Sequence, residues 1–125
     1  MKTAGRDRRA AAERNGRRAE RFAALLLALK GFRILARRFK ASGGEIDIAA
    51  RRGNLLVLAE VKTRADLDAA VLALTPAGRR RIEAAGQAFI ARRPHLARLA
   101  LRYDIIAVAG LKVRHLPDAW RGRAP

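Results

Sequence analysis

Apolar residues recur at helical spacing between residues 15 and 30, and this pattern predicts an amphipathic helix. Asn15 is suited to cap the start of this helix, and Gly31 is suited to end it. The apolar side chains expected to form its inner face are Ala19, Phe22, Ala23, Leu26 and Leu29. Residues 1–14 are rich in Arg and Ala, so we expect a basic arm, either frayed or a helical extension that orders on binding.

Two extended segments follow this helix. Residues 32–39 alternate between apolar and polar side chains, which predicts a first strand or an extended segment that leads into a sheet. Residues 42–44 form a turn, and residues 45–50 alternate again. In that second segment we expect two acids on one face and two apolar side chains on the other, Glu45 and Asp47 against Ile46 and Ile48.

Residues 55–62 are apolar on both faces as far as Glu60, which predicts a central strand covered on both sides. Thr75 followed by Pro76 begins a helix, with Thr75 as its N-cap. The other predicted elements are a short helix or loop at 66–74, the helix at 75–92, strands at 102–109 and 111–116, and a tail at 117–125. This order predicts an α/β fold in which a mixed β-sheet carries helices on both faces.

A turn signal, Gly53-Asn54, separates the two middle strands. If these two residues form the whole loop, Asp47 lies opposite Glu60, and Glu45 lies opposite Lys62. A four-residue loop shifts the pairing by two residues and keeps these side chains on one face. A slip of one residue puts them on opposite faces, so any site built from them depends on the register of the hairpin.

The charge of the chain is strongly unbalanced. Its 125 residues, enough for one domain, include 28 Lys and Arg against 11 Asp and Glu, a formal net charge of +17. Such a charge indicates a partner rich in phosphate, with nucleic acid as the leading candidate and an anionic membrane surface as the second. The alternative is a basic, Arg-rich proteome in which Arg replaces Lys on solvated faces.

Several classes of protein are excluded by composition. The chain has no cysteine, so disulfides, zinc fingers, iron–sulfur clusters and thiol catalysis are excluded. The two histidines, His95 and His115, stand apart in the sequence, and we expect no His-based zinc site. The longest apolar run, residues 22–29, is too short to cross a bilayer, and no signal-peptide pattern precedes it. We therefore expect a cytoplasmic protein without a membrane partner.

The acids and the lysine of the predicted hairpin suit a divalent metal ion that acts on a polyanion. Mg²⁺ prefers oxygen ligands, few of them from protein, with water and substrate phosphate as the others. Asp47 and Glu60 supply carboxylates, and the backbone carbonyl of Val61 supplies a third oxygen. Lys62 projects on the same face as Glu60, where it could orient a water or stabilise a phosphate. The alternatives are an ordinary ion pair between Glu60 and Lys62 and a solvent-facing Asp47.

This pattern resembles the PD-(D/E)xK motif of metal-dependent nucleases in the restriction-endonuclease-like superfamily. Over residues 16–118 the chain more closely resembles the YraN-like family of small bacterial proteins, which are similar in fold to archaeal Holliday-junction resolvases. The resemblance is carried by Gly16, Glu20, Ala23, Gly31-Phe32, Ile34-Leu35, Gly44-Glu45-Ile46-Asp47, Glu60-Val61-Lys62-Thr63-Arg64, Thr75-Pro76 and Arg102-Tyr103-Asp104. Ala19, Arg38 and Gly78 depart from the family pattern.

The resemblance implies a restriction-endonuclease-like fold and a metal-dependent DNA endonuclease. Asp47 and Glu60 would bind Mg²⁺ or Mn²⁺, and Lys62 would be catalytic. Glu20 would have a supporting acidic role in catalysis, and Glu45 would support the metal ligands without binding the ion. The alternative for Glu20 is a surface acid near a helix N-terminus, where the helix dipole favours it.

The resemblance also implies a domain layout and a substrate. The chain would comprise a basic arm (1–14), one nuclease-like domain (15–118) and a C-terminal tail (119–125). Its partner would be double-stranded or branched DNA. Many relatives cut two strands as symmetric dimers, so a homodimer is compatible with this resemblance.

Basic side chains on either side of the hairpin are the candidates for phosphate contacts. They are Arg17, Arg18, Arg38, Arg64, Arg79 and Arg80. Binding through them would be salt-sensitive, and since little in the sequence suggests base readout, we expect structure-selective or non-specific binding. Two other functions stay open: a non-catalytic nucleic-acid-binding module and a basic adaptor that binds acidic partners.

Overall fold

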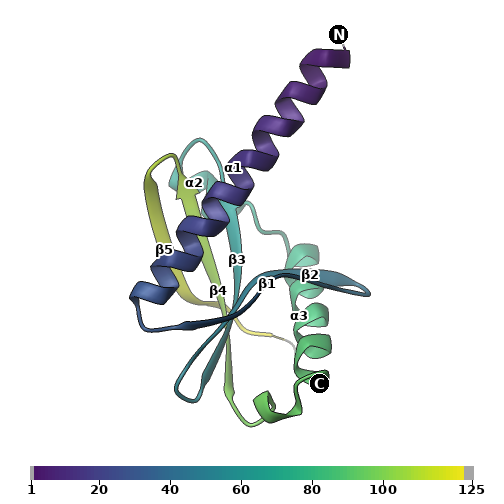
Figure 1. The fold of residues 1–125 in the computed structure, drawn as a ribbon, viewed down its shortest axis with the longest axis vertical. Coiled ribbons are helices and arrows are strands. Elements are labelled where there is room, and N and C mark those ends of the chain that lie inside the picture. Colours follow the sequence, from purple (N-terminus) through teal and green to yellow (C-terminus); the bar gives the residue numbers. More distant parts are fainter. Residues whose placement is uncertain (1, 123–125) are drawn as a thin grey trace.

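The computed structural model describes residues 2–122 of the chain (Figure 1). The elements follow in the order α1 (Lys2–Leu29), β1 (Arg33–Ala41), β2 (Gly44–Arg52), β3 (Leu55–Thr63), α2 (Leu67–Leu72), α3 (Pro76–Ala91), a 3₁₀ turn η1 (Pro94–Leu96), β4 (Ala100–Ala109) and β5 (Lys112–Trp120). Thr75 caps α3 as predicted, because its side chain accepts a hydrogen bond from the N–H of Gly78 at 3.0 Å.

The five strands form one mixed sheet in the order β1-β2-β3-β4-β5. Strands β3 and β4 are parallel, and the other three neighbouring pairs are antiparallel. Parallel neighbours need a crossover connection, which α2 and α3 provide here. The mixed sheet predicted from the sequence is therefore confirmed, with β3 at its centre.

Two separate hydrophobic clusters cover the two faces of the sheet. On one face, Phe89 of α3 packs in a cluster with Leu58 of β3. On the other, Ala23 and Leu27 of α1 pack in a cluster with Val57 of β3. The helices thus lie on both faces, as predicted (Figure 1). None of the helices in the described part of the chain is long and apolar enough to cross a membrane.

Helix α1 differs from its predicted extent and inner face. It begins at Lys2 instead of at Asn15, so the described part of the basic arm is the helical extension that was one of its two expected forms. The Ala, Arg and Glu residues of this segment favour helix without needing an apolar face. Ala19, Ala23 and Leu27 are buried. Phe22 and Leu29 are 37% and 78% exposed, so the predicted inward placement of these two side chains is wrong.

The end of α1 follows the prediction. Gly31 has a φ of +91°, and the N–H of Phe32 donates to the carbonyl of Leu27 at 2.9 Å. The N–H of Gly31 also donates to the carbonyl of Ala28. These two bonds form a Schellman motif, which needs a left-handed residue at the position of Gly31.

The end of the chain also differs from the prediction. Strand β5 runs to Trp120, where a tail beginning at Pro117 was expected. The indole of Trp120 stacks on Tyr103 with ring centroids 5.0 Å apart, and this contact holds the last strand on the sheet. Residues 123–125 of the predicted tail lie outside the described residues.

Candidate functional site

The loop at Gly53-Asn54 has the two-residue length that sets the predicted register. The β2–β3 ladder pairs Arg52 with Leu55 and continues to Ile48 with Ala59. The ladder stops there, one step before the position where Asp47 would oppose Glu60. Instead, the Asp47 Oδ2 accepts a hydrogen bond from the backbone N–H of Val61 at 2.8 Å. This bond fixes Asp47 against the last part of β3.

Strand β2 leaves β3 at this point because the β1–β2 hairpin curls onto α3. A Cβ on Gly44 would lie 1.8 Å from the backbone oxygen of Arg81, so only glycine allows this approach. Ile46 follows the curl and packs in the α3 cluster, whereas Ile48 packs in the α1 cluster. The predicted placement of Ile46 and Ile48 on one face is therefore wrong.

The same curl changes the partner of Glu45. It pairs with Lys40 of β1, and no β2–β3 pairing places it opposite Lys62. Glu45 nevertheless lines the same hollow as Lys62, since that hollow lies where the two strands diverge.

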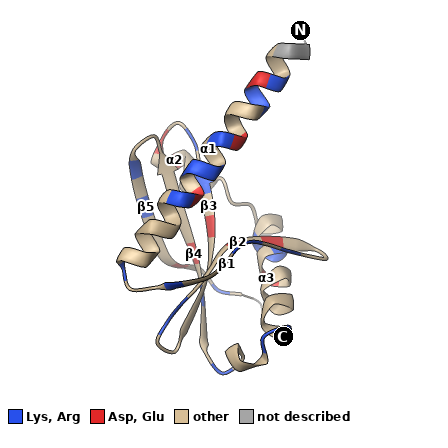
Figure 2. Cartoon of the chain, in the orientation of Figure 1, with Lys and Arg blue, Asp and Glu red and all other residues tan. Residues whose placement is uncertain are grey.

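This hollow, which we call the α3-side hollow, has a volume of about 450 Å³. It brings together three acids and three cationic side chains: Glu45, Asp47, Glu60, Lys40, Lys62 and Arg81. These acids belong to a chain whose charged residues are mostly basic. Figure 2 shows this contrast where α1, with many Lys and Arg residues, passes beside an acidic segment of β3. Sequence reasoning assigned no individual role to Lys40 or Arg81. The Gly43-Gly44 turn was the available signal, because it lets the hairpin approach α3.

Lys62 and Glu60 form an ion pair, with 3.2 Å between Nζ and Oε1. Their side chains are 26% and 13% exposed, so the pair lies in the wall of the hollow rather than in open solvent. The ordinary ion pair considered from the sequence is thus present. It does not satisfy the second acid, however, because Asp47 receives only the Val61 N–H and a hydrogen bond from Glu60.

Burial and, next to it, the negative charge of Asp47 raise the pKa of Glu60 to about 8, although Lys62 opposes both effects. The pKa of Asp47 is also raised, chiefly by burial, against the lowering effect of the hydrogen bond from Val61. A hydrogen bond between the two carboxyl groups favours the proton on Glu60. Below about pH 8 Glu60 therefore holds its proton.

Glu20 lies on the opposite side of Asp47. It is 6% exposed, and its carboxylate accepts hydrogen bonds from Arg37 at 3.2 Å and from Arg38 at 2.9 Å. With Arg38, Asp47 and Val61 it lines a second hollow of about 230 Å³. Glu20 is therefore not a surface acid near a helix start. Its charge acts on Asp47 across this hollow and contributes to the raised pKa of Asp47.

The donor set suits a Mg²⁺ or Mn²⁺ ion that keeps water and substrate ligands. The N–H and C=O of one strand residue point toward the same neighbour, so the Val61 carbonyl faces the gap beside Asp47. Asp47 and Glu60 add two carboxylates, the number typical of a Mg²⁺ site. Within residues 2–122, no group of three or more His, Cys, Asp or Glu side chains could hold a metal ion by itself.

The six predicted phosphate contacts differ in their surroundings. Arg17, Arg18, Arg64 and Arg80 are exposed and, within the described residues, form no ion pair. Arg38 is held by Glu20, which raises the pKa of the guanidinium. Arg79 lies over the ring of Trp120 at 5.7 Å, and its buried Nε has no hydrogen-bond partner.

Comparison with known proteins gives a family and no activity. Residues 19–108, which contain Asp47, Glu60 and Lys62, match the family described as "Uncharacterised protein family UPF0102". A UPF0102 protein of Paramagnetospirillum magneticum is 52% identical over 116 residues, 89% of this chain and 90% of the relative.

Two further relatives match over a similar extent. A UPF0102 protein of Parvibaculum lavamentivorans is 50% identical over 112 residues, 89% of this chain and 84% of that relative. A UPF0102 protein of Rhizobium meliloti is 48% identical over 114 residues, 90% and 93% of the two chains. These matches support the YraN-like resemblance, and the chain belongs to the uncharacterised protein family UPF0102.

Proposed function

We propose that this protein is a metal-dependent DNA endonuclease with a restriction-endonuclease-like fold. The observation that carries the proposal is that Asp47, Glu60 and Lys62 line one hollow, with Lys62 paired to Glu60 at 3.2 Å. Two partly buried acids with raised pKa values at one place, in a protein of net charge +17, suit an added cation. The cationic side chains that share the hollow suit a phosphate substrate.

The residues have separate roles in this proposal. Asp47, Glu60 and the Val61 carbonyl would hold Mg²⁺ or Mn²⁺, which when bound activates a water and neutralises charge on the phosphate. Lys62 already lies within 3.2 Å of Glu60, so its ammonium can turn to the attacking water or to a phosphate oxygen. Glu20 and Glu45 would adjust the charge around Asp47 without being ligands. Arg81 and Lys40 would face the phosphates next to the reacting one.

Cleavage assays on linear, flapped and four-way-junction DNA test the proposal. In Mg²⁺ or Mn²⁺, wild type should cut at least one of these substrates. Asp47→Asn and Lys62→Ala should each lose about a hundredfold or more in rate while still binding DNA. The matched controls are Asp68→Asn and Lys112→Ala, which remove the same charges at exposed positions and should leave the rate unchanged.

Calorimetric titration with Mg²⁺ or Mn²⁺ separates the site from the activity. The double variant Asp47→Asn with Glu60→Gln should lose the binding that wild type shows, and Asp7→Asn with Asp68→Asn should keep it. If wild type binds DNA but cuts none of the substrates in either metal, the proposal fails in favour of a non-catalytic nucleic-acid-binding module. Cleavage that persists in both Asp47→Asn and Lys62→Ala would contradict the site assignment.

A further inference from the structure

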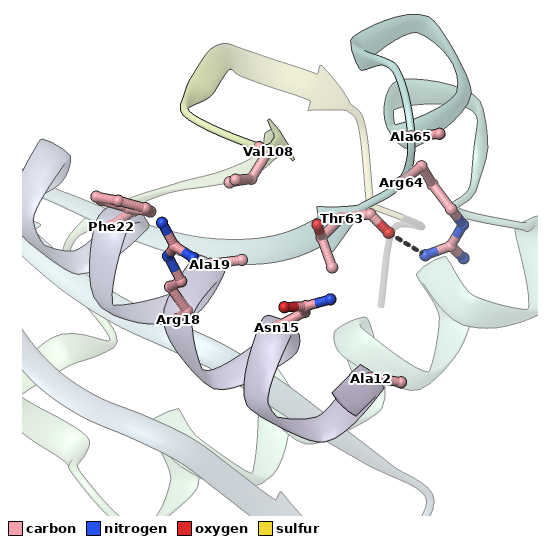
Figure 3. Close-up of a pocket in the computed structure, with 10 residues that line it drawn as sticks. Ala12, Asn15, Arg18, Ala19, Phe22, Thr63, Arg64, Ala65 and Val108 are labelled. Atoms are coloured by element: carbon pink, nitrogen blue, oxygen red, sulfur yellow. Dashed lines mark hydrogen bonds between the residues drawn. The ribbon is translucent and has the colours of Figure 1, made fainter. Parts of the chain in front are cut away.

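A third hollow of about 450 Å³ lies between α1 and the end of β3, on the face of the sheet opposite Lys62. We call it the α1-side hollow, and Figure 3 shows its walls. Helix α1 contributes Asn15, Arg18 and Phe22 to it, and the end of β3 contributes Thr63 and Arg64 (Figure 3).

The two arginines of this hollow have no acidic partner. In the described residues, Arg37, Arg102 and Arg114 each pair with a carboxylate, but Arg18 and Arg64 do not. Arg18 lies 5.7 Å from the centre of the Phe22 ring, and one nitrogen of Arg64 donates to the Thr63 carbonyl at 2.7 Å (Figure 3). A guanidinium has five N–H donors, so most of them stay free for an anion.

The hollow lies close to the proposed catalytic residues along β3. Side chains alternate along a strand, so Lys62 faces the α3-side hollow while Thr63 faces the α1-side hollow. Lys62 and Arg64 are two residues apart in the chain, so the two hollows adjoin at the end of β3.

We propose that the α1-side hollow is a binding subsite for a backbone phosphate of the DNA strand, near the phosphate at Lys62. Arg18 and Arg64 bind the phosphate oxygens, Asn15 and Thr63 add neutral donors, and Phe22 contacts the sugar. The direction of the strand across the end of β3 follows, since it must touch both faces of the sheet. This assignment rests on the proposed function for the position of the reacting phosphate.

The test is the salt dependence of binding to a 20-base-pair duplex, measured by fluorescence anisotropy in EDTA. Arg18→Ala with Arg64→Ala should lower the affinity about tenfold. It should also lower the slope of log K against log[NaCl] by about 0.9 for each phosphate that the variant no longer neutralises. The control is Arg33→Ala with Arg98→Ala, which removes two exposed arginines near the other end of β3 that form no ion pair within residues 2–122. It should change the slope little.

Equal decreases of slope in the two double variants would overturn the subsite. So would calorimetry showing that wild type binds inorganic phosphate in a site that Arg18→Ala with Arg64→Ala abolishes, with the DNA slope unchanged. The two proposals can fail separately. If only Arg18→Ala with Arg64→Ala decreases the slope and the protein cuts no DNA, the subsite is supported and the nuclease is rejected. If the protein cuts DNA and the two double variants decrease the slope equally, the nuclease is supported and the subsite is rejected.

Discussion

Asp104 is a fully buried acid, and Asp47 and Glu60 are partly buried acids on the adjacent strands, yet their surroundings are opposite. Asp104 is fully buried and accepts hydrogen bonds from Arg102 at 2.8 and 2.9 Å, from His115 at 2.7 Å and from the N–H of Asp118 at 3.0 Å. Burial alone would raise the pKa of Asp104, but the hydrogen bonds from His115 and Arg102 outweigh it, and the pKa is lowered.

At Asp47 the hydrogen bond from Val61 does not outweigh the effect of burial, and at Glu60 the charge of Lys62 does not, so the pKa of each acid is raised. The fully buried carboxylate of Asp104 is therefore well satisfied, whereas Glu60 has one ion pair, with Lys62, and Asp47 has none within the described residues. The surroundings of Asp104 stabilise the fold, whereas those of Asp47 and Glu60 favour the binding of an added cation. Departures of this second kind concentrate at functional sites.

The largest expected effect is on stability at Asp104. Asp104→Ala leaves buried Arg102 and His115 without their acceptor, so we expect a loss of about 3–5 kcal/mol in the free energy of unfolding, measured with urea. Asp68→Ala is the control, because Asp68 pairs with Arg114 at the same 2.8 Å but is 85% exposed. Its loss should stay under about 1 kcal/mol. Similar losses in the two variants would remove the contrast between the sites.

Glu60→Gln should instead stabilise the metal-free protein at alkaline pH. Folded Glu60 has a pKa of about 8 against an ordinary 4.5, so the folded state binds the proton more tightly. Its contribution to stability is complete below about pH 4.5 and is lost as the pH rises through 8. At pH 8.5 in EDTA, Glu60→Gln should exceed wild type by about 1–3 kcal/mol, with little difference at pH 5. Parallel pH profiles would contradict this.

Metal affinity should depend on pH through the same proton. Below about pH 8 a bound ion must displace the proton of Glu60, so affinity for Mg²⁺ should rise up to tenfold per pH unit and level off above 8. Calorimetry at pH 6.5, 7.5 and 8.5, in buffers of different ionisation enthalpy, should detect up to one proton released per ion. Affinity independent of pH would show that Glu60 is not a ligand.

A smaller effect is expected at Arg38, whose charge acts on Asp47 and Glu20. Its φ is +54°, a conformation that Asn tolerates well, so Arg38→Asn removes the charge without adding backbone strain. We expect Mg²⁺ affinity to rise about two- to fivefold. Arg37→Asn, which also loses its ion pair with Glu20, is the control. Equal effects would assign the change to Glu20 rather than to Asp47.

Local signals in the sequence predicted the core of the site. Gly53-Asn54 is a strong hairpin turn, and a two-residue loop fixes register, so the pattern alone could bring Asp47 and Glu60 together. The alternation of the same strand placed Lys62 beside Glu60, and the family resemblance added Glu20. For Asp104, which follows Arg102 on a buried strand, the sequence predicts a structural ion-pair or capping residue, and its bonds with Arg102 confirm the ion pair.

Contacts between distant segments could not be predicted. The curl that separates Ile46 from Ile48 depends on the close approach of Gly44 to the backbone of Arg81. His115 stands alone in the sequence, yet it lies between Asp104 and Lys30, each at 2.7 Å. These relations exist only after the sheet has formed.

The length of α1 bears on the length of duplex that the protein would contact. Its N-terminal turns project past the sheet, and residues 2–11 span about 15 Å at 1.5 Å per residue (Figure 1). A duplex aligned with this projection would gain roughly four base pairs of contact, at about 3.4 Å each. An oligonucleotide that ends at the α1-side hollow would lose all of it. If the protein binds DNA as proposed, its affinity would therefore depend on the length of the duplex.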